Sequence, residues 1–202
     1  MAAKIETNPL FPIFLKLEQM HLVVIGGGYV GLEKLSAVLQ NSPATRITLI
    51  ATQISAAIRA LCTSFPKVAL VEKPYEPADL VAADLVIVAV NDPALSLQAY
   101  TDAKALGKWV NVADKPTLCD FYLSAVVQKG NLKIAISTNG KSPTVAKRIK
   151  ELLNEILPDE IDELLHNIQN IRNGIKGDFE EKVRQLNQLT ESLVSKKNHL
   201  PK

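Results

Sequence analysis

One short stretch restricts the possible folds of this chain more than any other: LVVIGGGYVGLEK, residues 22–34. An apolar run leads directly into Gly26, Gly28 and Gly31, which have the spacing G-x-G-x-x-G, and a helix-like segment follows. In such a strand–turn–helix unit the first glycine permits the tight turn, the second lets a pyrophosphate approach the backbone, and the third allows close helix–strand packing. The helix N-terminus adds N–H donors and partial positive charge. The stretch predicts a dinucleotide site, and a tight turn without a ligand is the alternative.

Further strand-like and helix-like segments alternate with this unit. Runs rich in Val and Ile occupy residues 21–26, 46–51, 67–71, 83–90 and 108–113. Helical candidates lie between them at residues 29–40, 53–64, 77–82 and 94–106. Alternation of this kind is typical of a parallel sheet with right-handed crossovers, whose strands are buried on both faces. We therefore predict a Rossmann-type, doubly wound α/β domain over residues 1–115.

The pattern changes after residue 115. Strand-like runs at 119–127 and 131–137 flank Lys129-Gly130, which predicts a β-hairpin. Ser142-Pro143 predicts a helix start, because serine caps the first turn and proline fixes the first helical φ. Two more periodic segments, about 161–171 and 178–195, predict further helices, separated by glycines. We expect a hairpin and helix region at 116–157 and a small helical C-terminal domain at 158–202, with coiled-coil pairing of this tail as an alternative.

The end of the second predicted strand bears on the choice of dinucleotide. An Asp or Glu usually stands there to hold the adenosine ribose. Here the strand is followed by Thr52 and Gln53, which can hydrogen-bond a ribose less strongly than a carboxylate does. Arg46 and Arg59 are poorly placed by sequence to bind a 2′-phosphate. The pattern favours NAD over NADP modestly.

Two other predicted strands end near carboxylates. Asn91 and Asp92 follow the fourth strand, at the sheet edge where ligands bind in such folds, and Asp92 is equally a cap for the helix that begins at Pro93. Asp114, in the segment NVADKP at residues 111–116, follows the fifth strand and has no His within ten residues. A lone carboxylate there can accept a proton, or it can cap a turn before Lys115-Pro116.

Composition narrows the class of protein. The net charge of +2 argues against a general nucleic-acid binder, and two cysteines are too few for a disulfide framework. The N-terminus has no signal-peptide pattern, and no apolar run approaches the roughly 20 residues of a membrane span. The three histidines, His21, His166 and His199, form no pair with metal-ligand spacing. We expect a cytoplasmic protein with neither a nucleic-acid nor a membrane partner.

Three segments, in this order along the chain, resemble the siroheme-synthase dehydrogenase/ferrochelatase family: LFPIFLKLEQMHLVVIGGGYVGLEK, NVADKPTLCDFYLSAVV and IAISTNGKSPTVAKRIKELL. The resemblance covers about residues 8–157. It implies oxidation of precorrin-2 to sirohydrochlorin with NAD⁺ and, in many members, insertion of Fe²⁺ to give siroheme. It also implies a homodimer in which the hairpin and helix region, 116–157, forms much of the contact.

The resemblance also assigns roles to residues. The family's acid falls on Asp114, which would accept protons in both steps and hold Fe²⁺ transiently. The expected cofactor contacts are Gly26, Gly28, Tyr29, Val30, Gly31, Thr52, Gln53, Asn91 and Asp92. The expected tetrapyrrole contacts are Asn111, Ser137, Thr138, Asn139, Gly140, Lys141 and Ser142. A basic cluster suits the substrate's carboxylates, with a solvated helix face as the alternative: Lys141, Lys147, Arg148 and Lys150.

The chain departs from the family pattern at two positions. Ser124 stands where proline is common, and Gly31 stands where alanine is common. The chain ends at Lys202, without room for the fused methyltransferase of some relatives, so a separate enzyme is expected to supply precorrin-2. Two rival functions stay open: a dehydrogenase without chelatase activity, and a non-catalytic NAD-sensing dimeric module. The acid segment followed by STNGKSP favours the enzyme, since a sensor needs no second ligand cavity.

Overall fold

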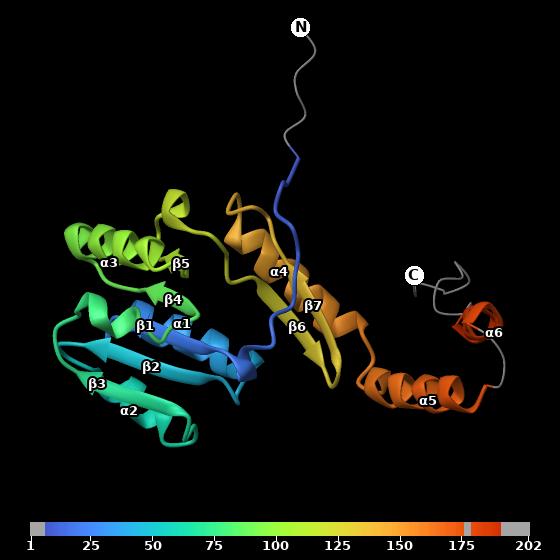
Figure 1. Cartoon of the computed structure of the whole chain (residues 1–202). Helices are drawn as coiled ribbons and strands as arrows, with labels where there is room; N and C mark the ends of the chain where they lie inside the picture. The colour runs from blue at the N-terminus through green and yellow to red at the C-terminus, as the bar shows by residue number, and fades with distance from the viewer. Residues whose placement is uncertain (1–6, 176–178, 191–202) are drawn as a thin grey trace, which may run out of the picture. The chain divides into compact units, whose positions relative to one another are not determined.

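The computed structural model describes residues 7–175 and 179–190. Its centre is a five-stranded parallel sheet in the order β3-β2-β1-β4-β5 (Figure 1). The strands are β1 (His21–Ile25), β2 (Arg46–Ala51), β3 (Val68–Glu72), β4 (Leu85–Val88) and β5 (Trp109–Val112). The order reverses between β1 and β4, which is the topological switch point where ligands bind in such folds. The predicted Rossmann-type sheet is confirmed.

Helices cover both faces of this sheet (Figure 1). They are α1 (Tyr29–Asn41), α2 (Ala56–Cys62) and α3 (Pro93–Ala105), with a short 3₁₀ helix at Pro77–Leu80. Alternate residues of β1 point to opposite sides: Leu22 and Val24 pack with α1 and α2, whereas Val23 and Ile25 pack with residues that include Ala99 of α3. Burial on both faces explains why these strands read as continuous apolar runs.

A hairpin and three helices follow the sheet. They are β6 (Ala125–Lys129), β7 (Leu132–Ile136), α4 (Pro143–Ile156), α5 (Ile161–Gly174) and α6 (Phe179–Thr190). The chain separates into two compact units: one reaches to Ala125 and includes Ile136–Ala146, and the other holds Val126–Ala135 and the chain from Lys147 onward. This division cuts through the predicted 116–157 region, and the predicted domain boundaries stay predictions. No helix in the described part of the chain is both long and apolar enough to cross a membrane.

The hairpin differs from the prediction at its first strand. Residues 119–124 are not a strand; β6 begins at Ala125, and the turn residues are Gly130-Asn131 instead of Lys129-Gly130. The physical reason lies in residue 120, which bonds to β5: the Asp120 N–H donates to the Val110 carbonyl, and its carboxylate accepts the Val110 N–H. The turn falls where Gly130 supplies a positive φ of 54°.

Two helix predictions were too long. The helix predicted over 53–64 begins at Ala56, because Ser55 caps it by accepting a hydrogen bond from the Ile58 N–H. The segment predicted over 77–82 is a single 3₁₀ turn. The helix expected over 178–195 is α6, and residues 191–195 lie outside the described residues, as do the predicted break at Gly177 and His199.

Candidate functional site

The glycines of the βα turn differ in whether the fold itself requires a residue without a side chain. Gly26 has a φ of +126°, and a Cβ added there would lie 2.2 Å from the Ala89 carbonyl oxygen. A Cβ at Gly27 would lie 2.1 Å from the Gln53 carbonyl oxygen, and one at Gly31 would lie 2.2 Å from that of Gly26. The packing of the chain alone therefore accounts for these three.

Gly28 is the exception, because a Cβ added there would meet no atom of residues 7–175 or 179–190 within 4 Å. Gly28 is exposed and is the N-cap residue of α1, with no side chain to cap the helix. The first N–H groups of any helix lack partners within it. An open glycine before uncapped N–H groups is the arrangement that a pyrophosphate needs.

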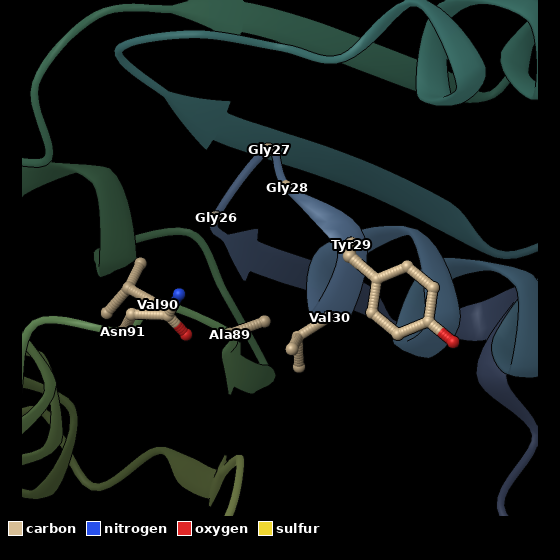
Figure 2. Close-up of a pocket in the computed structure, with 8 residues that line it drawn as sticks. All are labelled: Gly26, Gly27, Gly28, Tyr29, Val30, Ala89, Val90 and Asn91. Carbon is tan, nitrogen blue, oxygen red and sulfur yellow. The ribbon is translucent and has the colours of Figure 1, made fainter.

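A pocket of about 240 Å³ opens at this turn (Figure 2). Residues from the ends of β1 and β4 and the start of α1 form it: Gly26, Gly27, Gly28, Tyr29, Val30, Ala89, Val90 and Asn91. In Figure 2 the Val30 side chain points toward Ala89, whereas the Tyr29 ring extends away from Ala89, Val90 and Asn91. The pocket thus brings together five of the nine predicted cofactor residues, Gly26, Gly28, Tyr29, Val30 and Asn91, and its backbone character fits a dinucleotide phosphate.

The loop after β2 adjoins the same turn. The Ser55 N–H donates to the Gly27 carbonyl at 3.0 Å, and the exposed Thr52 and Gln53 lie in this loop. Two predicted cofactor residues therefore lie beside the glycine turn.

Sequence reasoning missed Glu72, at the end of β3. Its Oε1 accepts the Ile54 N–H at 3.2 Å, and its Oε2 lies 2.7 Å from Arg59 Nη2. The Ile54 N–H and Arg59 hold the pKa of Glu72 below its usual value. The sequence signal that could have indicated Glu72 is its position directly after the predicted strand 67–71, at the sheet edge where ligands bind.

Asp92 has a structural use next to the pocket. Its Oδ1 accepts the N–H groups of Ala94 at 2.8 Å and Leu95 at 3.2 Å, and it is the N-cap of α3. Asn91, its neighbour, lines the pocket. Helix capping is sufficient to explain an aspartate at position 92, and a contact between Asp92 and the cofactor stays a prediction.

Asp114 lies at the same edge of the sheet, just beyond β5. The preceding residue, Ala113, donates its N–H to the Val88 carbonyl at 2.9 Å, and Val88 directly precedes the pocket residue Ala89. Asp114 is exposed and has a φ of +58°, in the left-handed region that few residues other than Gly, Asn and Asp adopt. Backbone in this region often accompanies functional residues.

A partly buried thiol and a buried amide hold the loop that carries Asp114. The Cys119 sulfur lies 3.3 Å from Val112 N, Val112 O and Lys115 O, and burial raises the pKa of this thiol. The buried Asn111 donates from Nδ2 to the Phe121 carbonyl at 2.8 Å. Asn111 was predicted to bind substrate; the structure shows its amide tying the loop to the following segment, and the substrate role stays a prediction.

The predicted tetrapyrrole loop, residues 137–142, folds as a turn onto the start of α4. Asn139 and Gly140 have φ values of 53° and 73°, and the Thr138 hydroxyl donates to the Ser142 carbonyl at 3.1 Å. Ser142 Oγ accepts the Val145 N–H at 3.2 Å, so the predicted cap is confirmed. The roles of Ser137, Lys141 and the rest of the loop toward a substrate stay predictions.

The histidines serve local structure in the described residues. The His21 ring is buried with Nδ1 3.0 Å from the Ala82 carbonyl oxygen and Nε2 2.9 Å from Thr48 Oγ1. The exposed His166 has Nδ1 2.8 Å from the Asp162 carbonyl oxygen. No group of three or more His, Cys, Asp or Glu side chains in residues 7–175 and 179–190 has the geometry of a metal site.

Comparison with known proteins identifies two family matches. Residues 13–125 match the family described as "Putative NAD(P)-binding", and residues 129–155 match the one described as "Sirohaem biosynthesis protein central". A siroheme synthase of Psychrobacter cryohalolentis is 36% identical over 166 residues, covering 82% of this chain and 31% of the relative. One of Pseudomonas putida is 34% identical over 175 residues, covering 87% and 35%. The chain therefore spans about a third of the length of these curated relatives.

A solved structure has the same fold. SirC, a precorrin-2 dehydrogenase, superposes with a TM-score of 0.70 over 89% of both chains, at 24% sequence identity. The two family matches follow one another in the order that the sequence resemblance implied. The first match alone covers more than half of the chain, so the chain belongs to this NAD(P)-binding family, and the sirohaem match behind it, with the siroheme-synthase relatives, confirms the resemblance to the siroheme-synthase N-terminal-type family.

Proposed function

We propose that this chain oxidises precorrin-2 to sirohydrochlorin with NAD⁺ and then inserts Fe²⁺ to give siroheme. One observation carries the proposal: an open glycine turn and the carboxylate of Asp114 follow strands that end at the same edge of one sheet. The names of the similar proteins, siroheme synthase and precorrin-2 dehydrogenase, support the substrate class. The proposed assembly is a cytoplasmic homodimer.

Dehydrogenation removes a hydride and a proton from the macrocycle. When bound, the nicotinamide supplies the hydride acceptor. The glycine turn and the α1 N-terminus would hold the dinucleotide phosphates, while Asn91 and Val30 would border the cofactor. Asp114 would accept the proton at its carboxylate and pass it to water, which its exposure permits.

In metal insertion the same carboxylate, that of Asp114, would again accept protons. The two pyrrole N–H groups of sirohydrochlorin lose their protons as Fe²⁺ enters, and Asp114 is a suitable acceptor for both. Fe²⁺ is a substrate in this step, and an oxygen ligand such as Asp114 can hold it briefly before the nitrogen macrocycle takes it. The loop at 137–142 would bind the substrate's carboxylates through its N–H groups, its hydroxyls and Lys141.

The direct experiment mixes the purified protein anaerobically with precorrin-2 and NAD⁺ and follows the visible spectrum before and after Fe²⁺ is added. We expect the sirohydrochlorin spectrum first and the siroheme spectrum second. A reaction that stops at sirohydrochlorin would contradict the chelatase step. No spectral change, with NAD⁺ binding intact, would contradict both steps and favour an NAD-sensing module.

A further inference from the structure

The acid that is missing from the end of β2 is supplied by the neighbouring strand. Ala51, the last residue of β2, pairs in parallel register with Glu72, the last residue of β3. The two strands therefore end level with each other, side by side in the sheet (Figure 1). Glu72 then reaches back across β2's end, because its Oε1 accepts the Ile54 N–H at 3.2 Å.

This carboxylate is held on the loop that touches the glycine turn. Ile54 lies between Gln53, whose carbonyl oxygen packs against Gly27, and Ser55, whose N–H donates to the Gly27 carbonyl at 3.0 Å. A dinucleotide whose phosphates lie on a glycine turn places its adenosine ribose at the end of the second strand. Glu72 thus occupies the neighbourhood where a strand-end acid would otherwise stand.

The same carboxylate neutralises a cation. Arg59, on α2, has Nη2 at 2.7 Å from Glu72 Oε2, and both side chains are about half exposed, 49% and 48%. An arginine near the end of the second strand is the usual partner of the 2′-phosphate of NADP. The prediction that Arg59 is poorly placed for this role was wrong: its contact with Glu72 brings it to this strand end, where its charge is already paired. A carboxylate has about four lone-pair positions, so Glu72 keeps acceptor capacity for ribose hydroxyls beyond its contacts with Ile54 and Arg59.

We propose that Glu72 determines the preference for NAD over NADP: it accepts the ribose hydroxyls, repels a 2′-phosphate and neutralises Arg59. The inference rests on the dinucleotide site of the proposed function and adds the residue that makes this site select NAD over NADP. It is independent of the tetrapyrrole, so binding of dinucleotide alone tests it. Exposed ion pairs contribute little to stability. We therefore assign the Glu72–Arg59 pair a role in cofactor specificity and not in stabilising the fold.

The test is the ratio of two dissociation constants, Kd for NADP⁺ over Kd for NAD⁺, measured by calorimetry on the full chain without tetrapyrrole. We expect Glu72→Gln to lower this ratio by about tenfold or more, because it removes the repelling charge and frees Arg59. Glutamine is isosteric and still able to accept the Ile54 N–H, and the melting temperature verifies that the fold is retained. Adding Arg59→Met to Glu72→Gln should raise the ratio again, whereas Arg59→Met alone should leave it within about twofold.

Glu76→Gln is the matched control, since Glu76 is an exposed carboxylate paired with Lys73 and not with the 52–55 loop. It should leave the ratio unchanged. An unchanged ratio in Glu72→Gln with a normal melting temperature would overturn the inference, as would a wild-type preference for NADP⁺. Wild-type protein that binds neither dinucleotide would contradict the proposed function as well.

Discussion

At the scale of single residues, glycines of one motif differ in whether packing or ligand binding explains them. Gly26 is fixed by its positive φ and by the Ala89 carbonyl, whereas a Cβ at Gly28 would have no atom of the described residues within 4 Å. A sequence shows the spacing of such glycines but not which of them the fold itself requires. Gly28 is therefore the position where ligand binding and stability can be separated.

We predict that Gly28→Ser weakens NAD⁺ binding by about tenfold or more without lowering the melting temperature. Serine is a favoured N-cap, so the helix is retained, but its side chain enters the open space and its oxygen competes for the N–H groups that would hold a phosphate. Calorimetry and a thermal melt measure the two effects. Gly26→Ala is the contrasting control, which should destabilise the fold by about 1–3 kcal/mol or more. Unweakened binding in Gly28→Ser would argue against a phosphate at this turn.

Asn111 offers a second test at this scale. Asn111→Leu leaves the Phe121 carbonyl without its 2.8 Å donor in a buried region, so unfolding in urea should show a loss of about 1–3 kcal/mol. Unchanged stability combined with weaker tetrapyrrole binding would instead assign Asn111 to the substrate.

At the scale of elements, α3 begins at the pocket because Asp92 caps it. Asp92→Ala removes the acceptor for two N–H groups and should cost about 1 kcal/mol of stability, whereas Asp92→Ser retains a capping oxygen and most of that stability. Urea denaturation measures the difference between the two variants. Equal stabilities, with NAD⁺ binding impaired in both, would show that the carboxylate contacts the cofactor and not the helix alone.

The strands and helices also show which parts of the fold can be predicted from the sequence. The five strands of the sheet were predictable, since burial on both faces leaves an unbroken apolar run and the glycine turn marks the first crossover. Residues 119–124 looked like a strand because of the run Phe121-Tyr122-Leu123, but their hydrogen bonds go to β5, including the Asn111 side chain. The Glu72 contact with Ile54 depends on how β3 aligns with β2, which local patterns do not encode.

At the scale of the whole molecule, α4 carries an exposed apolar stripe. Its members recur at helical spacing: Val145, Ile149, Leu152 and Ile156. Such a stripe is typical of a face that packs against a partner, and it supports the proposed homodimer through the 116–157 region.

We predict that Ile149→Asp converts a dimer into monomers in sedimentation equilibrium, because it places a charge in the centre of an apolar contact. Lys147→Asp, about 200° around the helix from Val145, is the control and should leave the dimer intact. A monomeric wild-type protein, or a dimer that survives Ile149→Asp, would contradict this assembly.

The central claim concerns the whole site, in which Asp114 serves the chemistry and the glycine turn binds the cofactor. The most direct measurement compares Asp114→Asn with wild type for NAD⁺ affinity and for conversion of precorrin-2 to sirohydrochlorin. Asparagine tolerates the φ of +58° nearly as well as aspartate, so the loop should be retained while the proton acceptor is lost. We predict an unchanged Kd for NAD⁺ and turnover reduced by about 100-fold or more. Normal turnover in Asp114→Asn would contradict the assignment of the acid.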